Sequence, residues 1–299
     1  MLAPIDKISN RGNDILQIEI TRKCSLYKCS NCSRGLPFRR DAIEMSLDVF
    51  REAVLSLEGW SGVVSLFGGN PPNHSRFPEI CGILAEHVPP HRRGLWANDL
   101  MEHGKIAAET FGRGRLNLNA HADARAAAEI DRWFPGKLIE KSRKEPAQHG
   151  AILVDRRDVG VSDGDWEVMR ENCDINRHWS GILVERDGRP YGYFCEIASA
   201  LDGIRRENHG VLAEPGWWRW KMDRFEHQVR NCCDRGCGVP LRMKGHLDRE
   251  DTYDVSPSWA ATIAAHGRRV PVKIAVHDSL SHEERSRELT DYLRLRTAR

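Results

Sequence analysis

Three cysteines near the start of the chain have the spacing of a single metal site. Cys24, Cys29 and Cys32 lie in TRKCSLYKCSNCSR, with C-x4-C-x2-C spacing. Thiolates bind zinc and iron–sulfur clusters, and three within nine residues can bind one metal centre. The first histidine to follow is His74. Three ligands leave one metal position open, where a small molecule can chelate iron; the alternative is zinc with a distant fourth ligand.

A second group of cysteines lies in the second half of the chain, at Cys173, Cys195, Cys232, Cys233 and Cys237. Two clusters of thiols indicate metal before disulfides in a reducing compartment. Cys232 and Cys233 are adjacent, and successive side chains diverge in extended backbone, so only one of them is expected to bind. Cys81 stands alone on a predicted helix with apolar neighbours, which favours a buried core thiol.

The composition is that of a globular protein with a sizeable core. The chain has 299 residues, 40% of them hydrophobic and 29% charged, and its formal net charge is +2. This balance argues against a strongly basic nucleic-acid binder. No apolar run has the length of a transmembrane helix, and the N-terminal segment lacks a signal peptide, so a cytoplasmic protein without a membrane partner is expected.

The elements that must position these residues alternate between strand and helix. Strands are predicted at 15–21, 63–67, 95–97, 115–121, 137–140 and 151–155, and helices at 46–57, 78–87, 100–110 and 123–133. Alternation of this kind predicts a parallel sheet, open or closed into a barrel. After residue 163, Asp187-Gly188 predicts a hairpin turn. Trp217, Trp218 and Trp220 are expected to pack, 245–254 reads as a polar loop, and 281–296 as a terminal helix.

With these motifs in this order, residues 14–160 resemble the radical S-adenosylmethionine (SAM) enzymes. The three cysteines follow the first strand, although that family usually has C-x3-C-x2-C spacing. Gly68-Gly69-Asn70-Pro71 follows the second strand, where the family has Gly-Gly-Glu-Pro. Asn98 ends the third strand in Trp-Ala-Asn-Asp, and Asn117 and Asn119 alternate on the fourth. Asn31 occupies a position that is often aromatic in the family.

The resemblance implies an α/β fold with two iron–sulfur clusters. It implies a partial (β/α)6 radical SAM barrel over 1–163, a small α+β twitch-like domain over 164–245 and a C-terminal extension over 246–299. The first [4Fe–4S] cluster would be held by Cys24, Cys29 and Cys32, and an auxiliary [4Fe–4S] cluster by Cys173, Cys195, Cys233 and Cys237, with Cys232 as the rival of Cys233. The cofactor-binding residues it implies for SAM are Gly68, Gly69, Asn70, Pro71, Asn98, Asn117, Asn119 and Asn31.

The activity implied by the resemblance is reductive cleavage of SAM to a 5′-deoxyadenosyl radical that abstracts hydrogen from a substrate. The outcome can be dehydrogenation, cross-linking or rearrangement, and the electron would come from a reductant such as flavodoxin or ferredoxin. A small-molecule substrate is expected; a peptide or a phage-type modified nucleobase are alternatives, the latter allowed by arginines such as Arg39 and Arg40. Glu19, Glu140 and Asp155 are either substrate contacts or salt-bridged carboxylates. A non-enzymatic zinc protein is the alternative of another class.

Overall fold

The computed structural model describes residues 15–26, 29–39, 43–145, 149–171, 173, 181–220, 222–243 and 251–280. Its main feature is a seven-stranded sheet with the order β4-β3-β2-β1-β5-β6-β7. The strands are β1 (Ile15–Thr21), β2 (Val63–Gly68), β3 (Arg93–Ala97), β4 (Arg115–Leu118), β5 (Ile182–Arg186), β6 (Arg189–Tyr193) and β7 (Val211–Leu212). All pairings from β4 across to β5 are parallel, and β6 and β7 run antiparallel. The parallel-dominant α/β sheet is consistent with a partial barrel.

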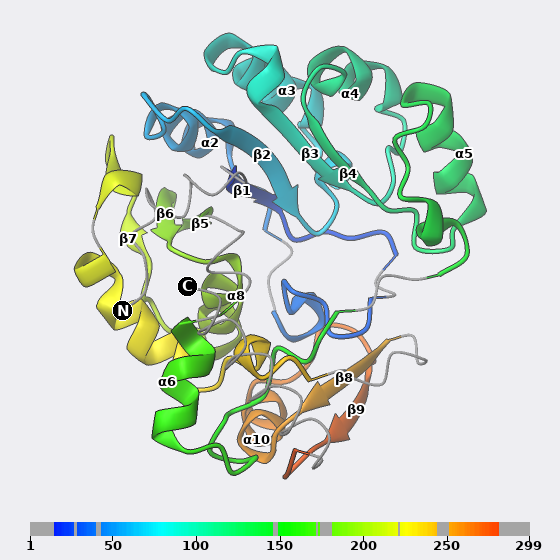
Figure 1. Ribbon diagram of the computed structural model, residues 1–299. Helices are drawn as coiled ribbons and strands as arrows, with labels where there is room; N and C mark the ends of the chain where they lie inside the picture. Colours follow the sequence, from blue (N-terminus) through cyan, green and yellow to red (C-terminus); the bar gives the residue numbers. More distant parts are fainter. Residues whose placement is uncertain are drawn as a thin grey trace, which may run out of the picture.

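Four helices cover one side of this sheet (Figure 1). They are α2 (Leu47–Leu55), α3 (Phe77–His87), α4 (Gly104–Phe111) and α5 (Ala124–Trp133). Ser46 and Asp123 cap α2 and α5 by accepting hydrogen bonds from the backbone N–H of Val49 and Ala126, as N-cap side chains do. The alternating Leu16, Ile18 and Ile20 of β1 belong to the same hydrophobic core as these helices. The sequence pattern predicts these elements because each has one clearly apolar face.

Two of the expected strands do not extend the sheet. Residues 137–140 and 151–155 each form a single parallel bridge, between Leu118 and Leu138 and between Leu153 and Val255. The first segment runs directly into a 3-10 turn at Glu140–Arg143, which leaves no length for a ladder. The second pairs with the C-terminal part of the chain. The six-strand count is therefore not reached, and four strands follow one another in the first half.

The predicted hairpin is present, and it joins the same sheet. Asp187 and Gly188 have φ values of 49° and 73°, the left-handed pair that a two-residue hairpin turn requires. β5 pairs in parallel with β1, with Gln17 opposite Ile182. The hairpin of 164–245 thus continues the sheet of the first half. The helices around it are α6 (Asp163–Glu171), α8 (Glu196–Arg205), α9 (Glu226–Gln228) and a π-helix at Val229–Cys233.

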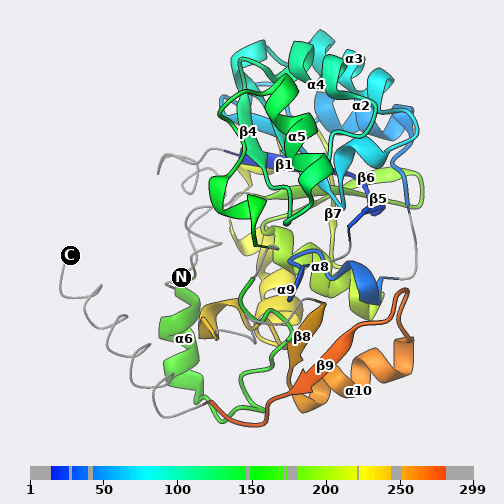
Figure 2. The same cartoon turned by 90° about the vertical axis from the view of Figure 1, so that its right-hand side faces the viewer.

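The C-terminal part forms a small unit on the opposite side from α2–α5 (Figures 1 and 2). It consists of β8 (Thr252–Val255), α10 (Pro257–His266) and β9 (Lys273–Val276), with the two strands parallel. The expectation of a loop over 245–254 is wrong at 252–254, because the polar residues of β8 are buried and hydrogen-bonded rather than solvated. The helix expected at 281–296 lies outside the described residues.

The tryptophans pack as expected. Trp217 and Trp218 are buried. Trp217 lies against Gly192 of β6, where an added Cβ would come within 2.5 Å of its ring. Trp218 makes an edge-on contact with Trp60, with ring centroids 5.2 Å apart. Cys81 is also a core thiol, and burial raises its pKa to about 12.

Candidate active site

A cavity of about 450 Å³ lies where the parallel strands β1 to β4 end. Ligand sites of open α/β sheets occur at this edge. Eight of the residues that the sequence singles out line it: Cys24, Cys29, Cys32, Gly68, Gly69, Asn98, Asn117 and Asn119. They come from the loop after β1 and from the ends of β2, β3 and β4. The structure therefore brings together residues up to 95 positions apart, from Cys24 to Asn119.

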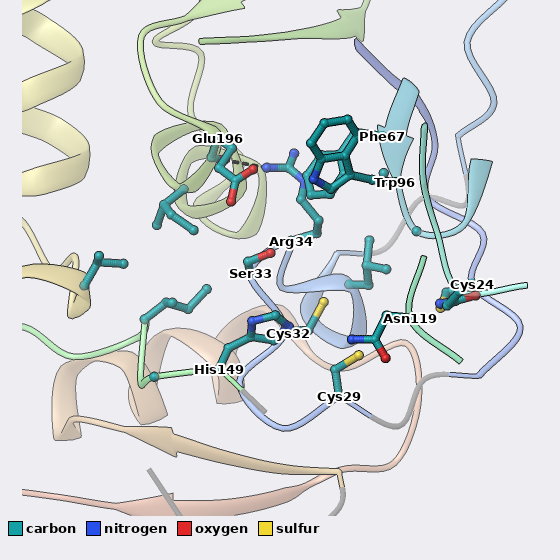
Figure 3. A pocket seen from close by; sticks show the side chains of 18 of the residues that line it. Cys24, Cys29, Cys32, Ser33, Arg34, Phe67, Trp96, Asn119, His149 and Glu196 are labelled. Atoms are coloured by element: carbon teal, nitrogen blue, oxygen red, sulfur yellow. Dashed lines mark hydrogen bonds between the residues drawn. The ribbon is translucent and has the colours of Figure 1, made fainter. Parts of the chain in front are cut away.

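The three thiols lie on the segment after β1, here called the first thiol loop. All nine cysteines of the chain are free thiols. Cys29 Sγ lies 3.5 Å from His121 Nδ1, and the Asn98 amide lies 3.5 Å from Cys24 Sγ. Figure 3 shows Cys29 and Cys32 close together, with His149 and Asn119 beside them. Burial, together with the other two thiols, raises the pKa of Cys29. Thiolates in this setting require an added positive charge, as a bound metal supplies.

Gly68 and Gly69 are held against the backbone of the first thiol loop. The Gly69 N–H donates to Thr21 O (2.9 Å) and the Asn70 N–H to Lys23 O (2.8 Å). An added Cβ would lie 2.1 Å from Thr21 O at Gly68 and 2.2 Å from Lys23 O at Gly69. Gly68 also has a φ of 137°. Glycine is thus required here for close backbone packing, in addition to facing the cavity.

Asn70 and Pro71 do not line the cavity. Both ends of the Asn70 amide are used within the protein: Oδ1 accepts from the backbone N–H of Asn98 (3.0 Å), and Nδ2 donates to Asp99 O (3.0 Å). Pro71 begins a short 3-10 turn. Direct contact with a ligand is therefore not the role that the geometry gives them. They fix the end of β3, and through it Asn98.

Asn31 is held by hydrogen bonds to the C-terminal part of the chain. It is buried, its φ is 49°, and it is not among the lining residues. Its Nδ2 donates to Asp254 Oδ2 (2.9 Å), and its Oδ1 accepts from the Asp254 N–H (2.8 Å). Its own N–H donates to Thr252 O (3.2 Å). Asn31 therefore fastens the first thiol loop to β8.

Sequence reasoning missed Arg34, which lies two residues after Cys32. Its guanidinium donates to Glu19 Oε1 (2.8 and 3.0 Å), to Ser199 Oγ (3.0 Å) and to the backbone oxygen of Glu196. This side chain thus links the first thiol loop to β1 and to the start of α8. Nothing local in the sequence signals the contact, because Arg34 and Glu196 are 162 residues apart.

Glu19 lies at the centre of a buried ion cluster and is not a surface carboxylate. Arg39 donates to both of its oxygens (2.8 and 3.1 Å), and Arg22 donates to Oε2 (3.0 Å). Burial alone would raise the pKa of Glu19, but Arg34, Arg39 and Arg22 outweigh it and hold the pKa well below its ordinary value. Arg39 is thus buried with Glu19 and offers no surface charge to a nucleic acid. Arg40 lies outside the described residues.

The other two candidate carboxylates and His74 are also engaged elsewhere. Glu140 pairs with Arg143 (2.9 Å) and Asp155 with Arg157 (2.5 Å). His74 Nε2 faces Met45 O (2.9 Å), and its Nδ1 accepts from the Arg76 N–H (3.0 Å). Both ring nitrogens are therefore occupied, and His74 is not placed to complete a zinc site with the first thiol loop.

Among the residues that line the cavity, three buried polar atoms have no hydrogen-bond partner within the described part of the chain: Glu196 Oε2, Trp96 Nε1 and Asn98 Oδ1. Asn98 lies at the first thiol loop, beside Cys24, whereas Glu196 and Trp96 lie close to Arg34 and Phe67 in Figure 3. Burial raises the pKa of Glu196, and the charge of Arg34 and the side-chain amide of Gln17 limit that rise. Most buried polar atoms in proteins are paired, so the Glu196 end of the cavity has the character of a binding surface.

All five cysteines of the second group surround a small cavity behind this one, lined also by residues of α8. Ile197 and Val239 line both cavities, so one layer of side chains separates them. Both Cys232 and Cys233 line this cavity. After burial, the groups that raise the pKa of Cys233 are the other four thiols, Cys237, Cys195, Cys232 and Cys173. The charged groups that act most strongly on the pKa of Cys232 are Asp202 and Arg205, and Cys195 follows them.

In the described part of the chain, none of the helices has the length and apolar character needed to cross a membrane.

No protein-family model matches the sequence, and neither does any curated protein. Among solved structures, the fold is similar to that of BtrN in complex with AdoMet and 2-DOIA, with a TM-score of 0.43 and 15% identity, over 74% of this chain and 87% of that chain. A second structure, of selenomethionine BtrN in an open conformation, gives a TM-score of 0.37 and 13% identity, over 78% and 89%. At these TM-scores neither similarity says what the cavity binds.

Proposed function

We propose that this chain is a radical SAM enzyme with two [4Fe–4S] clusters. The observation that carries the proposal is the cavity itself: Cys24, Cys29 and Cys32 open into it together with the glycine and asparagine residues at the ends of β2, β3 and β4. Cys24, Cys29 and Cys32 would hold one cluster and leave one iron for SAM. When bound, the cluster and SAM supply a 5′-deoxyadenosyl radical that abstracts hydrogen from the substrate.

The residues of the chain have distinct tasks in this proposal. Asn98, Asn117 and Asn119 offer amide donors and acceptors to the polar groups of SAM. Gly68 and Gly69 keep the end of β2 against the first thiol loop. The partly buried ring of Phe67 and the buried ring of Trp96 supply apolar wall, which excludes water from a reactive intermediate. A cavity of about 450 Å³ is in the size range of small-molecule sites, which supports a small molecule as substrate over a peptide or a nucleobase in a polymer.

For the auxiliary cluster of residues 164–245 we propose Cys173, Cys195, Cys233 and Cys237 as ligands. Four thiolates match the ligand number of a cubane cluster. The other thiols act more strongly on the pKa of Cys233 than on that of Cys232, which supports Cys233 as the ligand. Cys232 and Cys233 lie in the π-helix at Val229–Cys233. Short π-helices of this kind are frequent at functional sites. The electron would come from an external reductant such as flavodoxin or ferredoxin.

A zinc protein is the competing proposal. In it, the thiolates of each group would hold one tetrahedral zinc. Metal and sulfide analysis separates the two proposals, because zinc binds without sulfide whereas a [4Fe–4S] cluster brings about four irons and four sulfides.

The test is anaerobic incubation of the reconstituted chain with SAM and dithionite, with 5′-deoxyadenosine as the measured product. We expect 5′-deoxyadenosine from the wild type and none above background from the variant with Cys24, Cys29 and Cys32 all replaced by Ala. Cys81→Ala is the control, because Cys81 lies in the core away from both cavities, and it should retain SAM cleavage. Equal product from the triple variant and the wild type would overturn the proposal.

A further inference from the structure

We propose that Glu196 is a substrate-binding residue, and that it accepts a hydrogen bond from a hydroxyl or amino group of a small molecule. That the bound molecule is a substrate rests on the proposed function. That a molecule binds here rests on the geometry of this end of the cavity. Glu196 is the first residue of α8, directly after Cys195. It thus lines the cavity of the first thiol group and directly follows a cysteine that lines the cavity of the second.

One oxygen of the Glu196 carboxylate lies in the cavity wall without a hydrogen-bond partner among the described residues, while the side-chain amide of Gln17 lies beside the carboxyl group and lowers its pKa. Glu196 is 5% exposed and lines the cavity. Arg34 is the cation beside it, but its donors go to Glu19, Ser199 and the backbone oxygen of Glu196. The dashed line in Figure 3 marks the last of these bonds. The guanidinium therefore holds Glu196 in place without satisfying its carboxylate.

One further group tells what kind of ligand fits. Among the described residues, Trp96 Nε1 is a buried donor without a hydrogen-bond partner. A buried polar group without a partner costs about 1–3 kcal/mol. A ligand with a donor for Glu196 and an acceptor for Trp96 removes that cost. Hydroxyl groups satisfy both kinds of partner, and amino groups satisfy the acceptor.

The charge and shape of the Glu196 end favour one class of ligand. Among the residues that line the cavity, the other charged or titratable side chains are Arg34, Arg242, His121, His149 and the three thiols. Arg34, the cation beside Glu196, is already paired with Glu19, so the Glu196 carboxylate disfavours carboxylates and phosphates at this end of the cavity. Phe67, Trp96 and Ile197 form apolar wall around it. The ligand is therefore a compact body with an apolar face that carries hydroxyl or amino groups.

Three probes of the same ring and different head group test this inference: cyclohexanol, cyclohexylamine and cyclohexanecarboxylate. Their binding to the full-length reconstituted chain is measured by ligand-observed NMR. We expect the alcohol and the amine to bind more tightly than the carboxylate. Glu196→Gln should weaken the alcohol and the amine about fivefold, because a hydrogen bond to a charged acceptor is about twice as strong as one to a neutral acceptor. The ratio of amine to alcohol binding identifies which donor the site prefers.

Ser199→Ala is the matched control, since Ser199 also lies in α8 and bonds Arg34 but does not line the cavity. It should leave all three affinities within twofold. Tighter binding of the carboxylate probe, or unchanged alcohol and amine affinities in a folded Glu196→Gln variant, overturns the inference. Probe binding requires no SAM turnover. Glu196-dependent binding without 5′-deoxyadenosine formation would therefore leave this site standing and refute the proposed function, and the reverse result would do the opposite.

Discussion

The buried carboxylate of Glu19 shows how single residues hold the site in place. Three arginines surround it, and one of them, Arg34, carries the first thiol loop. Removing one partner of a buried ion cluster leaves charges without compensation, which costs roughly 3–5 kcal/mol. The sequence predicts that Glu19 lies on β1, but it does not predict which arginines surround its carboxylate. The contacts of Arg34 and Arg39 arise from the path of a loop that has no periodic pattern.

For Glu19→Gln we predict a loss of about 3–5 kcal/mol of unfolding free energy at neutral pH. The arginines hold the pKa of Glu19 well below its ordinary value of 4.5. The stabilisation is therefore fully present above pH 4.5, and it is lost as the pH falls below 4.5 toward the lowered pKa. Urea unfolding of both proteins from pH 7 down to pH 3 measures this. The difference between wild type and variant should shrink with acidification.

The exposed Glu140 provides the control for that series. Glu140→Gln, which breaks a surface ion pair with Arg143, should change stability by less than about 0.5 kcal/mol. A Glu19→Gln deficit that stays constant from pH 7 to pH 3 would show that the loss comes from packing and not from charge.

At the scale of elements, the sequence predicts the helices and strands whose apolar residues recur with a regular period, and it misses segments that have no such period. The sequence predicts β1, α2, α3 and α5 to within about two residues, because each has a clearly apolar face, and α2 and α5 also begin at a capping side chain. Asp187-Gly188 predicts the hairpin because both residues readily adopt the left-handed backbone conformation that its turn requires. The sequence predicts a loop in place of β8 because Thr252 and Asp254 are polar. Their burial depends on distant partners such as Asn31, which no local pattern reveals. The segment at 137–140 has strand composition but too little length to pair.

The contact between the end of β2 and the first thiol loop gives the second prediction. Gly69→Ala places a Cβ 2.2 Å from Lys23 O and 3.1 Å from Cys24 N, so the backbone that carries Cys24 must move. We expect the iron content to fall from about eight toward about four per chain, as the first cluster is lost and the second is kept. Iron analysis after anaerobic reconstitution measures this.

Gly82→Ala is the control for that substitution, because an added Cβ at Gly82 in α3 meets nothing within 4 Å. It should keep full iron and gain up to about 1 kcal/mol in stability from the higher helix propensity of Ala. If Gly69→Ala also keeps about eight irons per chain, the first thiol loop can move aside for the added Cβ while Cys24 still binds the cluster, which contradicts the prediction.

At the scale of the whole molecule, the candidate site lies between parts of the chain that are distant in sequence. The first thiol loop is bonded to β8 through Asn31 and Asp254, which are 223 residues apart. The second thiol group reaches the same region through α8. The sequence supplies the ligand types and the order of strands. It does not predict long-range hydrogen bonds such as that between Asn31 and Asp254, because no local sequence pattern indicates which buried asparagine binds which aspartate.

The link between Asn31 and Asp254 yields a third prediction. A double-mutant cycle of Asn31→Ala and Asp254→Ala should return a coupling energy of about 1–3 kcal/mol, because either substitution removes the buried hydrogen bond from Asn31 Nδ2 to Asp254 Oδ2. Denaturant unfolding of the four proteins measures it. Strictly additive effects would show that the two residues contribute independently, and that the bond does not fasten the loop to β8.

The central claim is that two separate thiol groups, which line two neighbouring cavities, hold two iron–sulfur clusters. Metal and sulfide analysis of the anaerobically reconstituted chain tests it most directly. We predict about eight irons and eight sulfides in the wild type. We predict about four of each when Cys24, Cys29 and Cys32 are replaced by Ala, and about four when Cys173, Cys195, Cys233 and Cys237 are replaced. Stoichiometric zinc with no sulfide in all three proteins would contradict the account.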